Sequence, residues 1–554
     1  MKITIEEEKI NVEFSFDQAL VNIIRELPGA KWNAKNKTWE FPKTLVVLST
    51  IFKTLEERHY EYFLYGNKWG GKKEETLNYR EYQFGTVPYQ HQKEALTFAL
   101  LQFDNSLRYN VSTGMALFME MGTGKTKTII DIAGIMHESK LVKSVLVIVP
   151  LSIIDTWIEQ LRQHSGREYV VHSLIGGKSK REKALDAFDK YNGEELKWAL
   201  INPEGLAMLK EQLKVKKFDM AVIDESTVIK NHTANRSKIA KLINSRFKII
   251  ASGNPIPKCH SEIFSQYEFV EPGVYGNNFY RFRDRYFELD HFKGIKDFKS
   301  SIAKEEYLEK FHSVSFVVKK EDCLDLPDKI YEKRYATMSQ EQGEVYKRMH
   351  EDAIVYYNDV TCAAPVVLSK FLRLSQITGG ALFGEGSERE KVVTLFSPNE
   401  KLKLLMETIE EIGGNKQIVI WTRFIFEIIL VKNTLLEAGF PCVSFCGENS
   451  KDEKTDALRI FREQGVRFFI GTPASGGKGI NDLVGCNNVI YYSNSYNTED
   501  REQSEARTHR QGTKGDHVLY IDLLMKDTID IVVLKVLRQN KSVSDAILSK
   551  TLLL

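Results

Sequence analysis

Hydrophobic and polar positions divide the chain into three stretches with different periods. In residues 1–65 apolar and polar residues alternate, and the region from Phe16 to Leu27 is amphipathic, which predicts a small α+β domain. Residues 66–85 are polar and rich in glycine and lysine, the composition of a linker. From residue 86 onward short apolar runs alternate with helical segments, which is typical of parallel α/β sheets.

Two sets of apolar runs indicate two sheets. The first set is Ala116–Met119, Val145–Val149, Met220–Ile223 and Ile249–Ala251, and the second is Ile418–Trp421, Val443–Phe445, Phe468–Ile470, Val489–Tyr492 and Val518–Leu523. A long helical, aromatic-rich region from about Phe264 to Gln376 separates them. We therefore expect an α/β fold of two tandem doubly wound parallel-sheet lobes, residues 86–328 and 329–554. Both carry helical insertions, and the second ends in a C-terminal brace.

Composition restricts the class of protein. Of the 554 residues 42% are hydrophobic and 27% charged, which is ordinary for globular domains with sizeable cores. The net charge of +2 means that any nucleic-acid surface must be a local patch. The amino terminus has no secretory-signal pattern, and no apolar run of about 18 residues could span a membrane.

The six cysteines do not have the spacing of a disulfide framework. Cys442 and Cys446 have a zinc-like spacing, but no second cysteine pair or histidine lies close to them in sequence. We interpret the cysteines as reduced and expect a cytoplasmic protein. The Lys-, Asn- and Ile-rich composition favours a phage or bacterial source, and thus a host cytoplasm if the source is a phage.

A glycine-rich turn between an apolar strand and a helical run predicts a phosphate-binding loop, Glu120–Thr126. Three residues bring backbone N–H groups close to phosphate oxygens: Gly122, Thr123 and Gly124. Lys125 is expected to reach the terminal phosphates, and the Thr126 hydroxyl to bind Mg²⁺. Met119 stands where the strict pattern has glycine, so this is a relaxed form of the motif.

An acidic pair and a glutamine complete the predicted nucleotide site. Asp224 and Glu225 follow an apolar strand about a hundred residues after the loop. Asp224 is expected to hold Mg²⁺, and Glu225 to act as the base towards the attacking water. Upstream of the loop, Gln92 can read adenine by donating and accepting hydrogen bonds, and Gln90 is a rival for that role.

These residues, with others in order over roughly residues 86–545, resemble the SWI/SNF-type ATPases of helicase superfamily 2. The segments that carry the resemblance are Ile223–Ser226, Ile229–Asn231, Ser237–Lys238, Ser252–Ile256, Phe316–Pro327, Leu372–Ile377, Gly476–Asn481 and Arg507–Gly512. The resemblance implies RecA-like lobes, ATP and Mg²⁺ as cofactors, a coupling role for Ser252 and nucleotide contact at Gly479. In this chain Ser226 and Thr227 replace the family's Ala-His, and Asn254 replaces a threonine, which leaves the charges and phosphate ligands in place.

The second lobe is expected to contribute positive charge to ATP hydrolysis. In the segment similar to the family's arginine motif, Arg510, with Arg507 one helical turn earlier, would face the γ-phosphate bound on the first lobe. An arginine there neutralises the transition state only when the lobes close. Closure and opening with each ATP would shift one lobe along the nucleic-acid backbone.

Tracking along nucleic acid requires hydrogen-bond donors to phosphates rather than readers of bases. Four residues at loops after strands could supply them: Ser152, Thr422, Arg423 and Thr472. The resemblance favours double-stranded DNA, tracked without full strand separation.

The amino-terminal domain resembles the HARP module of fork-remodelling annealing helicases. The residues that suit phosphate contact and base stacking are Lys31, Trp32, Lys35, Lys37 and Trp39. The alternative is a hairpin with core tryptophans and solvated lysines.

The sequence thus predicts an ATP-dependent DNA translocase that remodels forks or four-way junctions and is monomeric on DNA. A strand-separating helicase, the motor of a restriction or defence system, and an ATP-gated DNA clamp are the alternatives.

Overall fold

The computed structural model describes most of the chain. The described residues are 2–5, 9–14, 18–27, 29–42, 44–57, 63–66, 79, 81–109, 113–257, 259–289, 295–323, 326–358, 364–385, 391–463, 465–476, 483–510, 513 and 515–538. The chain forms two compact units, Met1–Cys323 and Leu324–Leu554.

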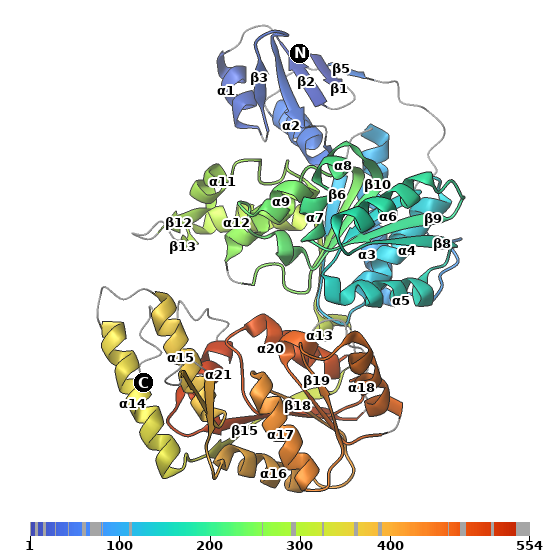
Figure 1. Cartoon of the computed structure of the whole chain (residues 1–554). Helices are drawn as coiled ribbons and strands as arrows, with labels where there is room; N and C mark the ends of the chain where they lie inside the picture. The colour runs from blue at the N-terminus through green and yellow to red at the C-terminus, as the bar shows by residue number, and fades with distance from the viewer. Residues whose placement is uncertain are drawn as a thin grey trace. The chain divides into compact units, whose positions relative to one another are not determined.

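The first unit begins with a small α+β domain, which confirms its predicted class (Figure 1). Its five-stranded sheet has the order β3 (Lys31–Asn33), β4 (Thr38–Pro42), β2 (Lys9–Glu13), β1 (Lys2–Ile5) and β5 (Phe63–Gly66). Two helices, α1 (Gln18–Glu26) and α2 (Leu45–Glu57), contribute Leu20, Ile24, Leu48 and Ile51 to its core. Most of the predicted linker, residues 66–85, lies outside the described residues. Tyr82 and Phe84, near its end, pack in the core of the lobe that follows.

That lobe, which we call the first lobe, is built on a seven-stranded sheet. Its order is β14 (Ser315–Val318), β6 (Thr113–Met119), β11 (Asn244–Ala251), β10 (Lys217–Asp224), β7 (Ser144–Ile148), β9 (Leu196–Ile201) and β8 (Tyr169–Leu174). All neighbouring strands are parallel. Because both faces are buried, alternate residues of one strand enter different cores, with Val145 and Val147 in one and Leu146 and Ile148 in the other.

Helices cover both faces of this sheet, as in a doubly wound fold. One face packs against α3 (Gln90–Tyr109), α4 (Lys125–Glu138) and α5 (Ile154–His164). The other packs against α6 (Lys178–Lys190), α7 (Gly205–Met208), α8 (Lys210–Val215), α9 (Asn235–Ala240) and α10 (Ile263–Val270). An aromatic-rich extension of the second core comprises α11 (Phe279–Tyr286), β12 (Phe287–Leu289), β13 (Ile295–Phe298) and α12 (Ser301–Ser313). Short elements complete the unit: η1 (Leu151–Ile153), η2 (Ser226–Ile229), η3 (His260–Glu262) and α13 (Lys320–Cys323).

The second unit has a six-stranded parallel sheet. Its order is β15 (Asp328–Ala336), β22 (His517–Met525), β21 (Asn488–Tyr491), β18 (Ile418–Trp421), β20 (Phe468–Gly471) and β19 (Cys442–Phe445). Helices α16 (Glu400–Ile412) and α17 (Ile425–Glu437) pack on one face, and α18 (Lys451–Glu463) packs on the other. The helical insertion is α14 (Gln340–Asn358) and α15 (Ala364–Thr378), which share a separate core with α21 (Ile529–Arg538). The remaining elements are α19 (Pro473–Gly476), α20 (Thr498–Thr508) and the antiparallel pair β16 (Ala381–Glu385) and β17 (Lys391–Leu395).

The predicted two-lobe α/β class is confirmed, and every apolar run predicted as a strand overlaps one. The two units divide between Cys323 and Leu324, and the boundary predicted from sequence was 328/329. Strand β15, which starts at Asp328, belongs to the second unit because it pairs with β22. Strand β14 lies inside the region expected to be helical. The predicted C-terminal brace falls largely outside the described residues. Among the described helices we find none with the length and apolarity to cross a membrane.

Candidate nucleotide and nucleic-acid sites

The predicted phosphate-binding loop lies between the carboxyl end of β6 and the first turn of α4. Gly122 and Gly124 have φ of 88° and 90°, a left-handed conformation that residues with a Cβ rarely adopt. The backbone therefore exposes its N–H groups at a helix amino terminus, where the helix dipole favours phosphate. Lys125 is buried, and its Nζ donates to the Met119 carbonyl at 2.9 Å, so the ammonium group is held inside the loop.

Gln92 is built into the wall of this loop. Its side-chain Oε1 accepts from the Tyr89 N–H at 3.0 Å, and its Nε2 donates to the Thr123 carbonyl at 3.0 Å. A Cβ on Gly124 would come within 2.1 Å of the Gln92 Nε2, so glycine is required there by this contact as well as by φ. The amide has one further N–H and one further lone pair to offer adenine. The rival Gln90 is exposed and bonds to Glu94.

The acidic pair lies at the end of β10, two strands from β6 in the same parallel sheet. Asp224 is buried, and its Oδ2 accepts from Trp157 Nε1 at 2.8 Å while its Oδ1 accepts from the Glu225 N–H at 3.0 Å. Burial raises the pKa of Asp224, and the nearby positive charge of Lys125 opposes that rise. A carboxylate with lone pairs to spare beside a lysine fits a Mg²⁺ ligand, since Mg²⁺ prefers oxygen donors.

Glu225 has a strained backbone. Its φ of 54° and ψ of 59° are left-handed for a residue that is not glycine. Such a conformation costs on the order of 1–3 kcal/mol and is concentrated at functional sites. Glu225 follows the last residue of β10 and precedes η2. Its backbone conformation therefore sets the direction of its side chain relative to Asp224.

Trp157 was not predicted from sequence. It lies in α5, fully buried, 67 positions before the carboxylate that it binds. Its hydrogen bond fixes the orientation of Asp224 and occupies one lone pair of the carboxylate. Trp157 is therefore a positioning residue for the acidic pair.

The predicted coupling segment, Ser252–Ile256, lies against the phosphate-binding loop. Ser252 is buried, and its Oγ accepts from the Asn254 N–H at 3.2 Å. A Cβ on Gly253 would come within 2.9 Å of the Met121 Cγ and 3.5 Å of the Lys125 Nζ, so the two loops approach closely.

A second buried connection joins the acidic pair to the coupling segment. Ser226 Oγ donates to Gln266 Oε1 at 2.6 Å, and Gln266 Nε2 donates to the carbonyls of Pro255 at 2.8 Å and Glu262 at 3.1 Å. Ser226 and Gln266 are fully buried. The residue that departs from the family's alanine is therefore one end of a hydrogen-bonded bridge, and Gln266 was not predicted from sequence.

Replacing the centre of this bridge tests its role. We expect Gln266→Leu to destabilise the first unit by about 1–3 kcal/mol, because buried partners lose their hydrogen bonds. If the chain is the DNA translocase that its sequence predicts, the distance travelled on DNA per ATP hydrolysed should also fall, measured as the ratio of the DNA translocation rate to the ATPase rate. Gln212→Leu, at a half-buried surface glutamine of α8, is the matched control. A lowered Tm with an unchanged ratio would show that the bridge is only structural.

In the second unit, α20 ends at Thr508. Arg507 therefore lies in the last turn of α20. Arg510 lies beyond the end of this helix, whereas the sequence pattern predicted a position one helical turn after Arg507. The Arg510 N–H donates to Thr513 Oγ1 at 3.3 Å, and burial lowers the pKa of its guanidinium group. His509, between them, bonds through Nε2 to the Pro327 carbonyl at 2.8 Å and fixes this turn to the sheet. Gly479 lies outside the described residues.

The four predicted phosphate contacts differ in accessibility. Ser152 is exposed, just after β7, and Thr472 is half-buried, just after β20. Thr422 is fully buried, with its hydroxyl 3.3 Å from the Phe424 carbonyl. Arg423 donates through Nη1 to Ser375 Oγ at 3.1 Å and stacks over Tyr496. In this conformation Ser152 and Thr472 suit phosphate contact better than the other pair.

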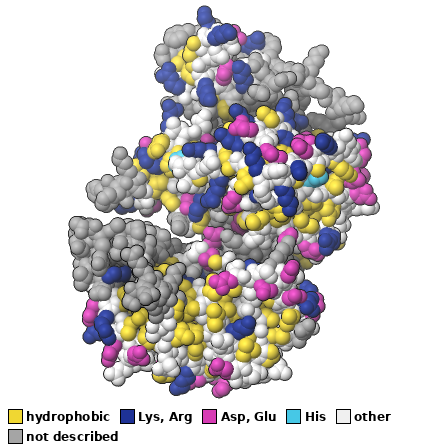
Figure 2. All heavy atoms as spheres, in the orientation of Figure 1, with side chains coloured by type: hydrophobic (Ala, Val, Ile, Leu, Met, Phe, Trp, Pro, Cys, Tyr) yellow, Lys and Arg dark blue, Asp and Glu magenta, His cyan; other side chains and the backbone are white. Residues whose placement is uncertain are grey.

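The predicted DNA contacts of the amino-terminal domain differ in solvent exposure. Trp39 belongs to the domain core with 7% of its surface exposed, as the alternative interpretation expected, whereas Trp32 is 52% exposed. Lys31, Lys35 and Lys37 are all exposed. Figure 2 shows lysine and arginine side chains over the first unit, interspersed with acidic ones.

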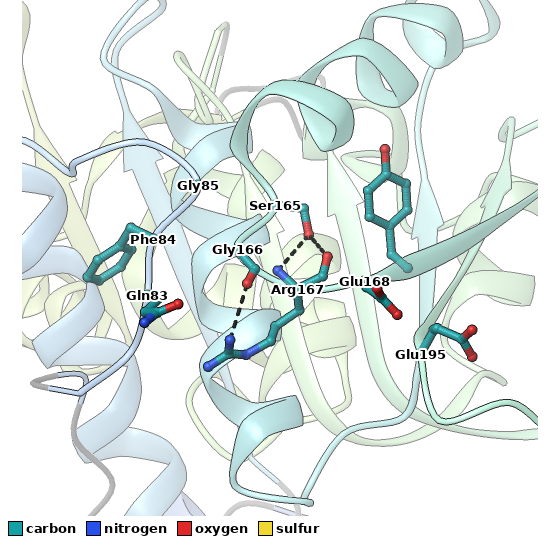
Figure 3. A pocket seen from close by; sticks show the side chains of 9 residues that line it. Gln83, Phe84, Gly85, Ser165, Gly166, Arg167, Glu168 and Glu195 are labelled. Carbon is teal, nitrogen blue, oxygen red and sulfur yellow. Dashed lines mark hydrogen bonds between the residues drawn. The ribbon is translucent and has the colours of Figure 1, made fainter.

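An open hollow on the first lobe lies apart from the predicted nucleotide site (Figure 3). Its lining includes Phe84, before α3, and Arg167 and Glu195, at the amino ends of β8 and β9. The phosphate-binding loop and the acidic pair lie at the carboxyl ends of parallel strands, the opposite edge of the sheet, where ligands of such folds bind.

Comparison with known proteins gives matches to two family models and to curated relatives. A family model described as the SNF2-related domain matches residues 91–378, more than half of the chain, and one described as the helicase conserved C-terminal domain matches residues 400–512. An uncharacterized ATP-dependent helicase of Mycoplasma genitalium is 24% identical, covering 81% of this chain and 41% of the relative. A putative ATP-dependent helicase/translocase of Bacillus subtilis is 26% identical, covering 72% and 43%.

More distant relatives include a human SWI/SNF-related, matrix-associated, actin-dependent regulator of chromatin, which is 24% identical and covers 71% of this chain and 38% of the relative. The chain spans about two fifths of the length of these curated relatives. Among solved structures, a Sulfolobus solfataricus SWI2/SNF2 ATPase core in complex with dsDNA is 25% identical. The match covers 83% of this chain and 92% of the Sulfolobus solfataricus chain, with a TM-score of 0.39.

Proposed function

Because the chain belongs to the SNF2-related family, we propose that it is a DNA-dependent ATPase that moves on double-stranded DNA and remodels branched DNA. The branched substrates are forks or four-way junctions. The chain acts as a monomer on DNA and in the cytoplasm.

ATP hydrolysis is supported by one observation, that two motifs lie at the same edge of the sheet. Lys125, the first residue of α4 after the loop that follows β6, and Asp224 at the end of β10 are close enough that the lysine charge opposes the rise in the Asp224 pKa that burial causes. The loop from Gly122 to Gly124 binds phosphates, and Lys125 neutralises the terminal ones. Thr126 and Asp224 would hold Mg²⁺, which would supply positive charge next to the phosphates.

Hydrolysis needs a base and a second source of positive charge. Glu225 orients and deprotonates the attacking water, and its strained backbone holds it next to Asp224. Arg507 and Arg510 of the second unit supply the charge that stabilises the transition state. Ser252 and its segment transmit the state of the phosphates away from the loop, through the close approach of Gly253 to Lys125.

DNA as the track is supported by exposed donors and by the relatives. Ser152 presents its hydroxyl at the carboxyl edge of the first sheet, where a backbone-tracking donor is needed. Thr472 occupies the corresponding place after β20. The Bacillus subtilis relative is named a helicase/translocase, and the same function is proposed for this chain.

The proposal is tested by measuring ATP hydrolysis with different nucleic acids. We expect double-stranded DNA to stimulate hydrolysis more than single-stranded DNA or RNA, and forked or four-way DNA to do so at lower concentrations than plain duplex. ATP-dependent branch migration of a four-way junction should accompany it. Equal stimulation by RNA would contradict a DNA motor. Separation of a plain duplex into single strands would identify a strand-separating helicase instead.

A further inference from the structure

The amino-terminal domain contains a cavity of about 360 Å³, separate from the candidate nucleotide site. Its lining includes Val12, Trp32, Lys37 and Trp39. In the sheet register Val12 pairs with Trp39, and Trp39 pairs with Trp32, so these three side chains form a row across β2, β4 and β3. Residues paired in this way project from the same face of the sheet.

The row changes from buried to exposed along its length. Val12 is fully buried, Trp39 is 7% exposed, and Trp32, on the outer strand β3, is 52% exposed. The two indole rings lie 5.4 Å apart between centroids, tilted by 54°. Trp39 therefore supports Trp32 from the core side and leaves a broad aromatic surface at the cavity mouth.

Charge at this mouth is positive. Lys37 lines the cavity and has a φ of 55°, and Lys35 is exposed in the same turn between β3 and β4. The hairpin's acidic residue, Glu40, pairs with Lys31 in the register and so projects from the opposite face. There it accepts from Lys9 at 2.6 Å and from Asn33 at 2.6 Å. Lys31 is thus separated from the cavity, while Lys35 and Lys37 remain beside it.

An apolar cavity with an exposed aromatic ring and lysines at its mouth is complementary to a flat ring attached to phosphates. We propose that this cavity binds one unpaired base of branched DNA, stacked on Trp32, with Lys35 and Lys37 contacting the flanking phosphates. This inference rests on the proposed function, since it identifies what the amino-terminal domain recognises at a junction.

The cavity would distinguish branched from plain DNA by an energetic criterion. A base inside a duplex must leave its pair and its stack to enter, which costs a few kcal/mol. An unpaired base at a branch point has already lost its partner and avoids most of that cost. The cavity therefore favours junctions without reading sequence, because every base has a flat face to stack.

The test uses the full chain, a fork with one unpaired base, the same fork with an abasic site at that position, and plain duplex. Trp32→Ala should weaken binding to the fork by roughly 5- to 150-fold, the effect of losing one stacked base. It should leave binding to the abasic fork, binding to plain duplex and duplex-stimulated ATP hydrolysis unchanged. Trp32→Phe should recover part of the affinity. Because Trp32 is half exposed, the Tm should stay near that of the wild type.

The lysines provide a matched pair. Lys37→Gln should flatten the salt dependence of fork binding, with roughly 0.7 less slope for each lost single-strand phosphate contact. Lys2→Gln, at an exposed position of β1 on the opposite face of the same sheet, should not change it. A 2-aminopurine at the unpaired position should be quenched by the wild type and not by Trp32→Ala.

Three results would overturn the inference: equal losses on the intact and abasic forks, quenching that persists without Trp32, or saturation of the cavity by free deoxynucleoside monophosphate at concentrations similar to the fork. If the wild type is stimulated by DNA but Trp32→Ala binds the fork normally, the cavity assignment fails and the motor stands. If no DNA stimulates ATP hydrolysis by the wild type, the proposed function itself fails.

Discussion

Glu225→Gln should lower the kcat of DNA-stimulated ATP hydrolysis by roughly 10²–10⁴-fold, the contribution of a positioned general base. Glutamine keeps the shape of the side chain but cannot take a proton from water. Binding of ATP and of DNA should persist, because Lys125 and Asp224 are untouched. The measurement is steady-state hydrolysis at saturating duplex DNA, with nucleotide binding measured separately.

Two further variants sharpen this result. Lys125→Ala should also abolish hydrolysis but should weaken nucleotide binding, since it removes the charge beside the terminal phosphates. Glu211→Gln, at an exposed position of α8, should have no effect. Near wild-type kcat for Glu225→Gln would show that Glu225 is not the base.

Arg510→Ala should lower kcat by about 10³-fold or more, with KM for ATP little changed. The arginine contributes charge in the transition state and not in the ground state, so its loss affects the rate and not the binding of ATP. Single-turnover hydrolysis together with nucleotide affinity separates the two quantities.

The choice of control matters for this arginine. Arg501, in α20, is unsuitable because it is half-buried and bonds to Asp522 at 2.6 Å and Glu505 at 2.8 Å, so its removal should unfold the second unit. Arg459→Ala, at an exposed position of α18, is the proper control. An Arg510→Ala variant with normal kcat and weakened ATP binding would place Arg510 outside the catalytic role.

The central strands of both sheets could be predicted from sequence because they are buried on both faces. β6, for example, is fully buried from Thr113 to Met119 and is therefore an almost continuous apolar run. Of the missed strands in the two large sheets, β8, β14 and β15 lie at sheet edges, whereas β9 lies inside its sheet and is mostly buried. β8 is mostly half-buried and β15 mostly exposed, so polar residues interrupt their patterns and no run forms.

The residues that meet at the candidate nucleotide site were predictable where a motif has fixed spacing, as at Lys125 and Asp224. Its supports were not, since Trp157 bonds to a residue 67 positions away and Gln266 to one 40 positions away. Sequence also could not separate Trp32 from Trp39, because both project from the same face. Only the position of β3 at the edge of its sheet makes Trp32 the exposed one.

If this chain is a motor on duplex DNA, its ATPase rate should depend on duplex length, measured at a constant concentration of DNA ends. A translocating motor hydrolyses more ATP per binding event on a longer track, so the rate should rise with length and then reach a plateau when dissociation precedes arrival at the end. A rate that is independent of length, with one ATP hydrolysed per binding event, would contradict the motor and identify an ATP-gated clamp.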